Sequence, residues 1–371
     1  MKLVCDRTTL LDALALTGGV VATRTPTPVL TCLKFSAKDG ILVISATDTE
    51  VGLSAPVASV SISEEGDALI PADKLNQIVR ASEDSTLSIE VGAKHVAVIK
   101  GQDSTFKIFG YDVREFPGVH QFPASKIDFE TTAGTLARLI HRTLFATAVD
   151  NSRYAINGVL MERKGKRLRL VATDGRRLAV AKGECTRAVD GDSQYIVPTK
   201  ALNVLGKLLG DPDAPVAVAR QDNLVVVRVG EGVDAATLVS RLVEGTFPPF
   251  EDVIPKEHDR KVTFDAAELT SAVRRAALLT NEESKGVRLA FGGGQLVLSS
   301  RAPELGEAEI KVDAEKYEGE PIEIGFNPQF ITDVLKVIDG QQVIIEMKAP
   351  NKPGVIKAGA DFTYVVMPVS L

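Results

Sequence analysis

A short run in which apolar and polar residues alternate occurs three times along the chain. Residues 42–48 read LVISATD, residues 168–174 read LRLVATD, and a fainter copy at 296–300 reads LVLSS. Alternation with a period of two is typical of a strand that has one buried face. Successive copies start about 126 and about 128 residues apart, which is the length of a small domain and too long for a solenoid repeat. The pattern predicts three similar domains, each closing its own core.

Two segments with helical periodicity accompany each copy. The first lies about thirty residues before the strand and opens near a Thr or Asp that can cap a helix. The second begins about twenty-five residues after the strand, with Pro at or just before its first turn, where the missing N–H has no intrahelical partner. Each third therefore reads helix, strands, helix and strands. The helical segments are 7–22, 72–81, 133–147, 199–209, 265–279 and 328–338.

The composition excludes several classes of protein. Hydrophobic residues make up 44% of the chain and charged residues 25%, as in folded globular proteins, and no apolar run approaches the ~18 residues that span a membrane. Asp6 follows an apolar run of only three residues, Leu3 to Cys5, which is too short for the core of a signal peptide. Cys5, Cys32 and Cys185 have neither disulfide nor metal-site spacing, which suits a reducing compartment. We therefore expect a cytoplasmic protein without a membrane partner.

No catalytic or metal-binding motif is recognisable in the sequence. The four histidines, at positions 95, 120, 141 and 258, form neither a His-Glu-x-x-His nor a Cys-x-x-Cys pattern, and no phosphate-binding Gly-x-x-x-x-Gly-Lys-Ser/Thr run occurs. The three glycines at 292–294 lie between two strand-like runs and open no helix, so they predict a hairpin turn. We expect no catalytic residue, no metal and no cofactor.

Asp48 and Asp174 end two of the repeated strands. As a pair of carboxylates they could bind a metal or act in acid–base chemistry. Their recurrence at a strand end in two domains instead favours a role in capping a turn.

The predicted helices differ in charge from the rest of the chain. The whole chain carries −6, but the helical segments hold ten Lys or Arg against five Asp or Glu, so they carry about +5 and the remainder about −11. A single basic helix is ordinarily a solvated face, whereas repetition over six helices indicates a surface that attracts phosphates without reading bases. Aromatic residues are only 5% and Trp is absent, so contact with duplex is favoured over stacking on a single strand.

Seven short motifs spread over the whole chain occur in a characteristic order. They are EFP (115–117), RYAING (153–158), ATDGRRLA (172–179), LVEGTFP (242–248), GVRL (286–289), EIGFN (323–327) and YVVMPVSL (364–371). In this order and spacing they resemble the bacterial beta sliding clamp family, the processivity subunits of DNA polymerase III. The resemblance covers the entire chain.

The resemblance implies an α+β fold of three clamp domains, residues 1–125, 126–257 and 258–371, each with two helices packed on antiparallel sheets. Two chains would join head to tail into a ring with pseudo-sixfold symmetry around duplex DNA, with the helices inside and the sheets outside. Such a ring converts weak phosphate attraction into a topological tether, and the acidic remainder keeps DNA off the outer face. The family is not catalytic; its partners are the polymerase III catalytic subunit, the clamp loader and other clamp-motif proteins such as repair polymerases, mismatch repair proteins and ligase.

The peptide pocket of the family lies between the second and third domains and accepts short linear peptides from its partners. Apolar, partly flexible walls with a Met suit a site that takes several peptides. Alternatively, residues 365–367 are simply the last strand of the third sheet, with Val366 on the opposite face from its neighbours. The matching positions are Ile156, Thr173, Gly175, Arg176, Arg177, Leu178, Pro248, Val253, Asn327, Phe330, Val365, Met367, Pro368 and Val369.

The resemblance also implies positions that face DNA and positions that join the two chains. Alternation puts Phe106 and Ile108 on one face of an edge strand, and an exposed apolar edge needs a partner. The DNA-facing positions are Arg24, Arg80, Arg138, Arg142, Arg153, Tyr154, Lys200 and Lys207. The dimer positions are Lys74, Phe106, Ile108, Leu278, Leu279 and Glu304.

Three positions depart from the usual pattern of the family. The family commonly has His in place of Arg176, often a basic residue in place of Asp252, and often Met-Arg-Leu where this chain ends with Ser370 between Val369 and Leu371. These departures affect the peptide preference, and we expect weaker selection for acidic flanks. Two alternatives stay open: a divergent clamp paralogue with altered partners, and an enzyme or ligand-binding module, for which the sequence offers no nucleophile, metal set or phosphate loop.

Overall fold

The computed structural model describes residues 1–149, 155–280, 286–338, 340 and 342–370. They form two compact units. The first unit comprises Met1–Ala137, Cys185–Gly191 and Lys200–Leu242. The second comprises Arg138–Glu184, Asp192–Thr199 and Val243–Leu371. The middle third of the sequence is therefore divided between the two units.

Six α-helices occur in the described part of the chain, two in each third, which confirms the predicted pattern. Five of them end earlier than predicted, and after α3 and α5 the chain tightens into a 3₁₀ turn. Asp6 and Asp265 cap helices as predicted, since their carboxylates accept backbone N–H groups of the first turn. The helices are α1 (Arg7–Gly18), α2 (Ala72–Ala81), α3 (Ala133–His141), α4 (Thr199–Leu208), α5 (Ala266–Ala276) and α6 (Pro328–Leu335).

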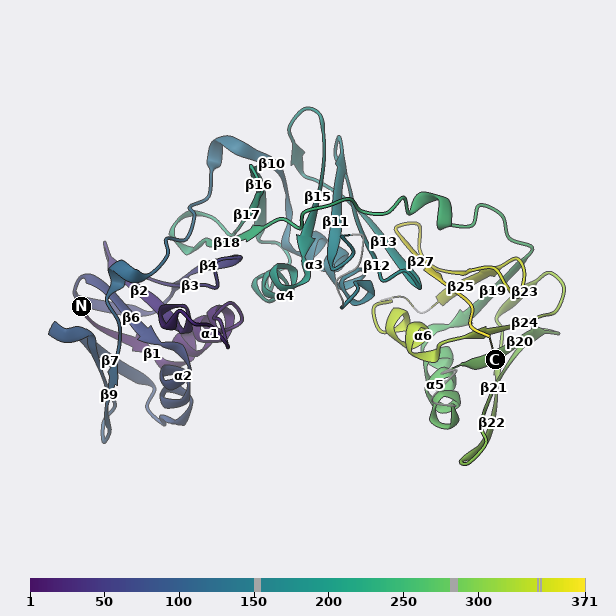
Figure 1. Cartoon of the computed structure of the whole chain (residues 1–371), viewed down its shortest axis with the longest axis horizontal. Coiled ribbons are helices and arrows are strands. Elements are labelled where there is room, and N and C mark those ends of the chain that lie inside the picture. The colour runs from purple at the N-terminus through teal and green to yellow at the C-terminus, as the bar shows by residue number, and fades with distance from the viewer. Residues whose placement is uncertain (150–154, 281–285, 339, 341, 371) are drawn as a thin grey trace. The chain divides into compact units, whose positions relative to one another are not determined.

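The first unit contains two sheets (Figure 1). Helix α1 packs on α2 and against β3 and β4. In order across the smaller sheet the strands are β5 (Val60–Glu64), β1 (Lys2–Asp6), β7 (Thr86–Val91), β8 (Val96–Lys100) and β9 (Thr105–Phe109). Across the larger sheet they are β14 (Arg187–Ala188), β10 (Ile127–Thr132), β16 (Pro215–Gln221), β17 (Leu224–Val229), β18 (Ala236–Arg241), β4 (Val51–Val57), β3 (Ile41–Thr47), β2 (Cys32–Lys38) and β6 (Gly66–Pro71).

The second unit has the same plan. Helix α5 packs on α6 and against β21 and β22. Across its larger sheet the strands are β15 (Asp192–Pro198), β11 (Gly158–Lys164), β12 (Arg167–Thr173), β13 (Arg177–Glu184), β27 (Phe362–Val366), β26 (Gly354–Ala358), β25 (Gln342–Met347), β19 (Arg260–Asp265) and β23 (Lys316–Glu318). Across the smaller sheet they are β22 (Gly306–Asp313), β21 (Gln295–Ala302), β20 (Val287–Gly292) and β24 (Ile322–Phe326).

The expectation that each repeat closes its own core is wrong at the sheet edges. In the first unit β18 of the middle repeat pairs antiparallel with β4 of the first, and in the second unit β13 of the middle repeat pairs with β27 of the third. An unpaired edge strand would leave a row of backbone N–H and C=O groups without partners, so pairing across the repeat border satisfies them. Neighbouring repeats therefore share a nine-stranded sheet within each unit.

The three repeated runs are strands, as predicted. They correspond to β3, β12 and β21, and Ile44, Leu170 and Leu298 on their buried faces have no exposed surface. The glycines at 292–294 make the turn between β20 and β21, with Gly293 and Gly294 at φ 59° and 79°, as a tight hairpin of two positive-φ residues requires. None of the helices in the described ranges is long and apolar enough to cross a membrane.

Candidate functional site

The turn after β12 places the first residues of the candidate peptide site. The carboxylate of Asp174 accepts the backbone N–H groups of Arg176 at 2.9 Å and Arg177 at 3.0 Å, and Thr173 Oγ1 accepts the N–H of Gly175 at 3.1 Å. Gly175 has φ 86°, which suits glycine. The turn after β3 is built in the same way, because Asp48 accepts two backbone N–H groups there. The reading of these aspartates as turn caps is confirmed.

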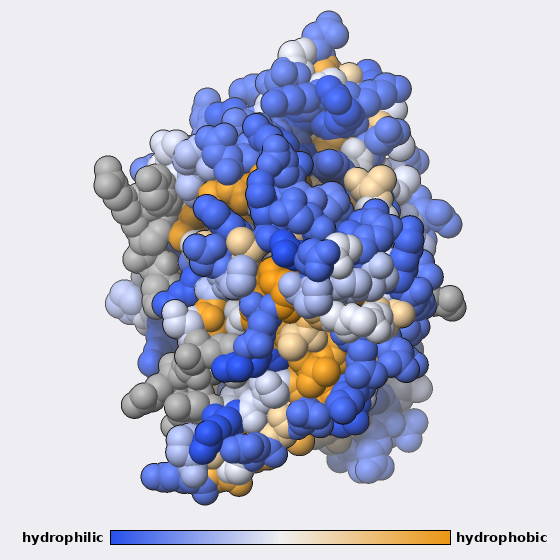
Figure 2. Space-filling view, turned by 90° about the vertical axis from the view of Figure 1, so that its right-hand side faces the viewer, coloured by the Kyte–Doolittle hydropathy of each residue, from blue (hydrophilic) through white to orange (hydrophobic). Residues whose placement is uncertain are grey.

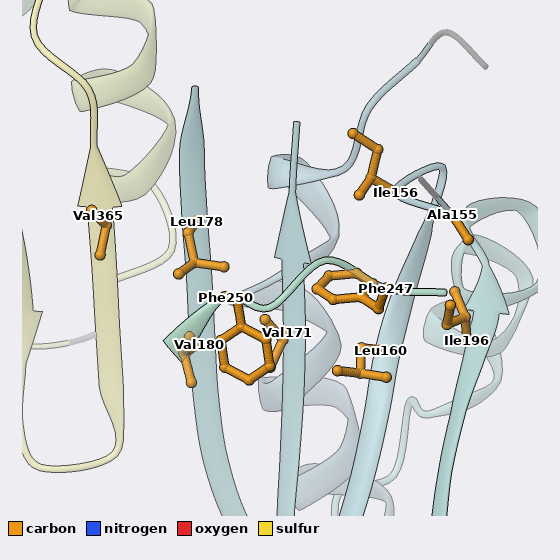
Figure 3. Close-up of a cluster of buried hydrophobic side chains, with 10 residues drawn as sticks. All are labelled: Ala155, Ile156, Leu160, Val171, Leu178, Val180, Ile196, Phe247, Phe250 and Val365. Carbon is orange, nitrogen blue, oxygen red and sulfur yellow. The ribbon is translucent and has the colours of Figure 1, made fainter. Parts of the chain in front are cut away.

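A cluster of apolar side chains covers one face of the large sheet beside this turn. Leu178 and Val365 are register partners on β13 and β27, and both belong to the cluster together with Ile156 (Figure 3). The rings of Phe247 and Phe250, on the segment leaving the middle repeat, lie over the strands and meet edge to face at 6.1 Å. Three of the predicted pocket residues are therefore brought together on one apolar surface.

Arg177 joins the turn to helix α6. Its Nε donates to Asp174 Oδ2 and its Nη1 to Asp333 Oδ2, both at 2.9 Å. Its Nη2 donates to the carbonyl oxygen of Phe145, also at 2.9 Å. The side chains of Arg177 and Asp333 are 11% and 17% exposed, so the pair is mostly shielded from water. The guanidinium thereby links β13 of the middle repeat with α6 of the third.

Aromatic rings enclose the same guanidinium. Its carbon lies 4.6 Å from the centre of the Phe330 ring and 5.5 Å from that of Phe145, within cation–π distance. The Tyr364 hydroxyl donates to the Phe330 carbonyl oxygen at 3.0 Å, which fixes the start of α6. Arg177 and Phe330, both predicted pocket residues, are therefore in direct contact.

The charges of this group stabilise one another. Burial alone lowers the pKa of Arg177, but the hydrogen bond that its guanidinium donates to Asp333 and the charge of Asp174 outweigh it, so the pKa lies above its usual value. Burial alone raises the pKa of Asp333, and hydrogen bonds from Arg177, Lys336 and Gln329 reverse this shift and hold it below the usual value. Both groups stay ionised at neutral pH.

The remaining predicted pocket residues lie in the same unit. The N–H of Met367 donates to the Arg176 carbonyl oxygen at 2.9 Å, and both side chains are exposed. The N–H of Val369 donates to Gly325 at 2.9 Å, and Asn327 caps α6 through its side chain. Pro248 and Pro368 are half-buried. Val253 is 51% exposed in a 3₁₀ turn (Glu251–Val253).

Several residues of this region were not singled out from the sequence. Asp333, Phe145 and Tyr364 surround Arg177, and Phe250 lies in the apolar cluster. The available sequence signal for Phe250 was its position three residues after another phenylalanine, Phe247. Contacts of Phe145 and Asp333 join segments far apart in the chain, which no local pattern reveals.

The predicted DNA-facing cations fall into different environments. Arg24, Arg80 and Lys207 are exposed. Lys200 pairs with Asp48 at 2.5 Å, and Arg138 pairs with Asp361 at 2.7 Å. Arg153 and Tyr154 lie outside the described residues.

Arg142 needs a correction. It is only 8% exposed, pairs with Asp361 at 3.1 Å and stacks over the Phe362 ring at 5.5 Å. A guanidinium enclosed in this way cannot reach a phosphate without breaking its contacts, so we remove Arg142 from the DNA-facing set.

The predicted dimer positions lie on an edge strand and helix α2 of the first unit, and on two turns of the second unit. Phe106 and Ile108 belong to the edge strand β9, but Ile108 is only 7% exposed, so the expectation of two exposed apolar side chains is wrong for it. In the second unit Leu278 is 76% exposed and Leu279 is half-buried. Figure 2 shows a mainly hydrophilic face with small, separate hydrophobic patches. Lys74 and Glu304 are exposed on their units.

Comparisons with known proteins cover the whole chain. Family models of the DNA polymerase III beta subunit match in three parts: the N-terminal domain at residues 1–120, the central domain at 130–249 and the C-terminal domain at 251–370. The chain is 35% identical to a beta sliding clamp of Pseudomonas putida and 33% identical to that of Escherichia coli, each over 374 residues and all of both proteins.

Solved structures agree. A sliding clamp of Pseudomonas aeruginosa bound to griselimycin has a TM-score of 0.91 at 34% identity, covering all of both chains. A DNA polymerase sliding clamp of Bacillus subtilis has a TM-score of 0.92 at 25% identity, covering 100% of this chain and 99% of that one. The resemblance seen in the motifs is thus confirmed, and the chain belongs to the DNA polymerase III beta subunit family, the beta sliding clamps.

Proposed function

We propose that this chain performs the DNA sliding clamp function of its family as a closed ring of two copies joined head to tail around duplex DNA. It is a non-catalytic subunit that confers processivity by tethering the polymerase III catalytic subunit and other clamp-motif proteins. We assign its domains to residues 1–125, 126–257 and 258–371, and its location to the cytoplasm. The family membership carries this proposal.

The candidate pocket supplies the tether. Leu178, Val365 and Ile156 offer an apolar surface for an anchor side chain, and Met367 adds an exposed, adaptable wall. Arg177 and Phe330 lie beside this surface as a rigid pair held by Asp333. Burying one large apolar side chain there is worth about 1.5–3 kcal/mol.

The peptide preference follows from the pocket mouth. Asp252 stands where the family often has a basic residue, so we expect peptides with acidic flanks to gain no advantage over neutral ones. Calorimetric titration of matched peptides with acidic and with neutral flanks measures this preference. A clear preference for the acidic peptide contradicts the assignment of Asp252, and no binding of a polymerase-derived peptide favours a divergent paralogue with altered partners.

DNA attraction rests on the exposed cations Arg24, Arg80 and Lys207, with Arg138 and Lys200 able to contribute if a phosphate displaces their carboxylate partners. Such contacts are independent of base sequence and weaken with salt. Ring closure rests on the β9 edge with Phe106 and on Leu278 and Leu279. Light scattering over a dilution series tests it: we expect a species near twice the 39.6 kDa of one chain, and a monomer throughout contradicts the ring.

A further inference from the structure

A cavity of about 390 Å³ lies in the first unit, beside the turn that follows β3. Its wall combines that turn with the ends of β17 and β18 and with residues 117–120, which cross the sheet. The volume falls within the usual range of ligand pockets, about 300–1,000 Å³. We propose that this cavity, the junction pocket, is a further peptide-binding site, which takes an extended segment with an apolar anchor and a basic side chain.

The junction pocket occupies the place in its unit that the candidate peptide pocket occupies in the other. Both lie where the middle repeat shares a sheet with its neighbour, β18 with β4 in one unit and β13 with β27 in the other. Both begin at a Thr-Asp turn with the same hydrogen bonds. In the register of the shared sheet, Gly52 faces Val239 as Leu178 faces Val365. Each residue of the first unit corresponds to one of the second: Thr47 to Thr173, Thr49 to Gly175, Glu50 to Arg176, Gly52 to Leu178, Pro117 to Pro248, and Val239 to Val365.

The floor of the junction pocket is apolar. Val119 and Val239 close over the bare backbone of Gly52, where a Cβ would lie 3.1 Å and 2.9 Å from their Cγ1 atoms. A side chain at position 52 would displace these valine methyl groups, whereas the second unit has Leu178 there. Leu224 completes the apolar lining. This surface suits the apolar anchor of a bound peptide.

The rim carries an acid at the position where the other pocket carries a cation, and Arg241 also lines the pocket. Glu50 stands where the second unit has Arg176, and its side chain is 67% exposed. Its ion pair with Arg241, at 3.6 Å and with Arg241 52% exposed, is of the surface kind that contributes little. A cationic side chain of a ligand can therefore replace Arg241 at Glu50. Asp222, next to the lining residue Asn223, is exposed and adds to the negative rim.

Thr49 at the rim supports a binding role. It has φ 78°, a conformation that β-branched residues rarely adopt, whereas Gly175 takes the equivalent φ of 86° without strain. Strained residues of this kind are retained where the side chain contributes to a site.

The test uses the full-length dimer with its valine methyl groups labelled with ¹³C. The probes are two capped pentapeptides, Ala-Leu-Arg-Leu-Arg and Ala-Leu-Glu-Leu-Glu, titrated into separate samples. We expect the arginine peptide to shift the methyl signals of Val119 and Val239 in a saturable manner, at least about fivefold more tightly than the glutamate peptide. The methyl signals of Val119 and Val239 are assigned by their disappearance in Val119→Ile and Val239→Ile. In the same spectra the methyl signals of Val365 report on the pocket of the second unit, so binding at the two sites is measured separately.

Charge reversal at the rim provides the control. Glu50→Arg should invert the preference at Val119 and Val239, and the matched variant Arg176→Glu should leave it unchanged, because Arg176 belongs to the other pocket. Both side chains are exposed, so neither change disturbs the core. Absence of saturable shifts at Val119 and Val239, equal affinity for both peptides, or a preference that survives Glu50→Arg overturns the proposal.

Discussion

Removing the Asp333 carboxylate tests whether the Arg177 pair holds the peptide pocket in shape. In Asp333→Ala the Nη1 donor of Arg177 loses its acceptor, while Nε and Nη2 keep Asp174 and the Phe145 carbonyl oxygen. A hydrogen bond to a charged group contributes about 1.5–3 kcal/mol, and a fully orphaned buried charge costs about 3–5 kcal/mol. Since the pair is 11% and 17% exposed and two contacts remain, we expect a loss of about 2 kcal/mol.

Part of this loss should appear in binding, because Arg177 packs on the Phe330 ring of the proposed pocket. Calorimetric titration of a polymerase-derived peptide should give a Kd raised about tenfold, which corresponds to about 1.4 kcal/mol. Asp333→Asn keeps an acceptor but loses the charge, so its Kd should lie between the Kd values of the native chain and of Asp333→Ala. Lys336→Ala is the matched control, since Lys336 contacts the same carboxylate at 3.2 Å but is 50% exposed and should change Kd less than about twofold. Equal affinities of Asp333→Ala and Lys336→Ala for the peptide would show that the Arg177–Asp333 pair does not hold the pocket in shape.

Four further results are expected. The pKa of Asp333 is depressed in the folded chain, so its ionised carboxylate contributes to stability above the usual carboxyl pKa, and this contribution is lost as pH falls through the folded pKa. Thermal melts of the native chain and of Asp333→Asn measure the difference in stability. This difference should stay constant from pH 7 to about pH 5 and shrink below about pH 4. Leu279→Asp should give a monomer in light scattering, because it places a charge in the proposed dimer contact, and a persistent dimer counts against that assignment. Burial, aided by the charge of Asp6, raises the pKa of Cys5 to about 12, so this thiol should not react with an aromatic disulfide reagent at pH 8 until the chain unfolds. Gly294→Val, at φ 79°, should lower stability by about 1–2 kcal/mol in calorimetry, while Gly210→Ala, which has open space for a Cβ, should not.

The repeat pattern predicted the six helices and the three repeated strands. Strands β3, β12 and β21 and all six helices follow from periodicity, capping residues and proline placement, which are local signals. The sharing of sheets between repeats could not be predicted, because the pairing of β18 with β4 depends on which strand edges meet and not on either sequence alone.

In the candidate site, too, local features could be predicted from the sequence and contacts between distant segments could not. The Thr-Asp turns were read from residues 47–48 and 173–174, since a carboxylate that follows a strand caps the turn by local hydrogen bonds. Asp333 was missed because its partner Arg177 lies 156 residues away. Arg142 was misplaced for a related reason, since Asp361 is distant in sequence and helix charge alone does not distinguish a surface cation from an enclosed one.

Retention on circular DNA shows directly whether the protein forms a closed ring around duplex DNA. The purified protein would be loaded by its clamp loader on nicked circular duplex and passed through a sizing column, before and after the circle is cut once. We expect the protein to elute with the circle at a salt concentration that abolishes phosphate attraction, and to be released when the DNA is linearised, because a ring can slide off an end. Loss from the circle at that salt concentration, or equal retention on circular and linear DNA, would contradict a closed ring around the duplex.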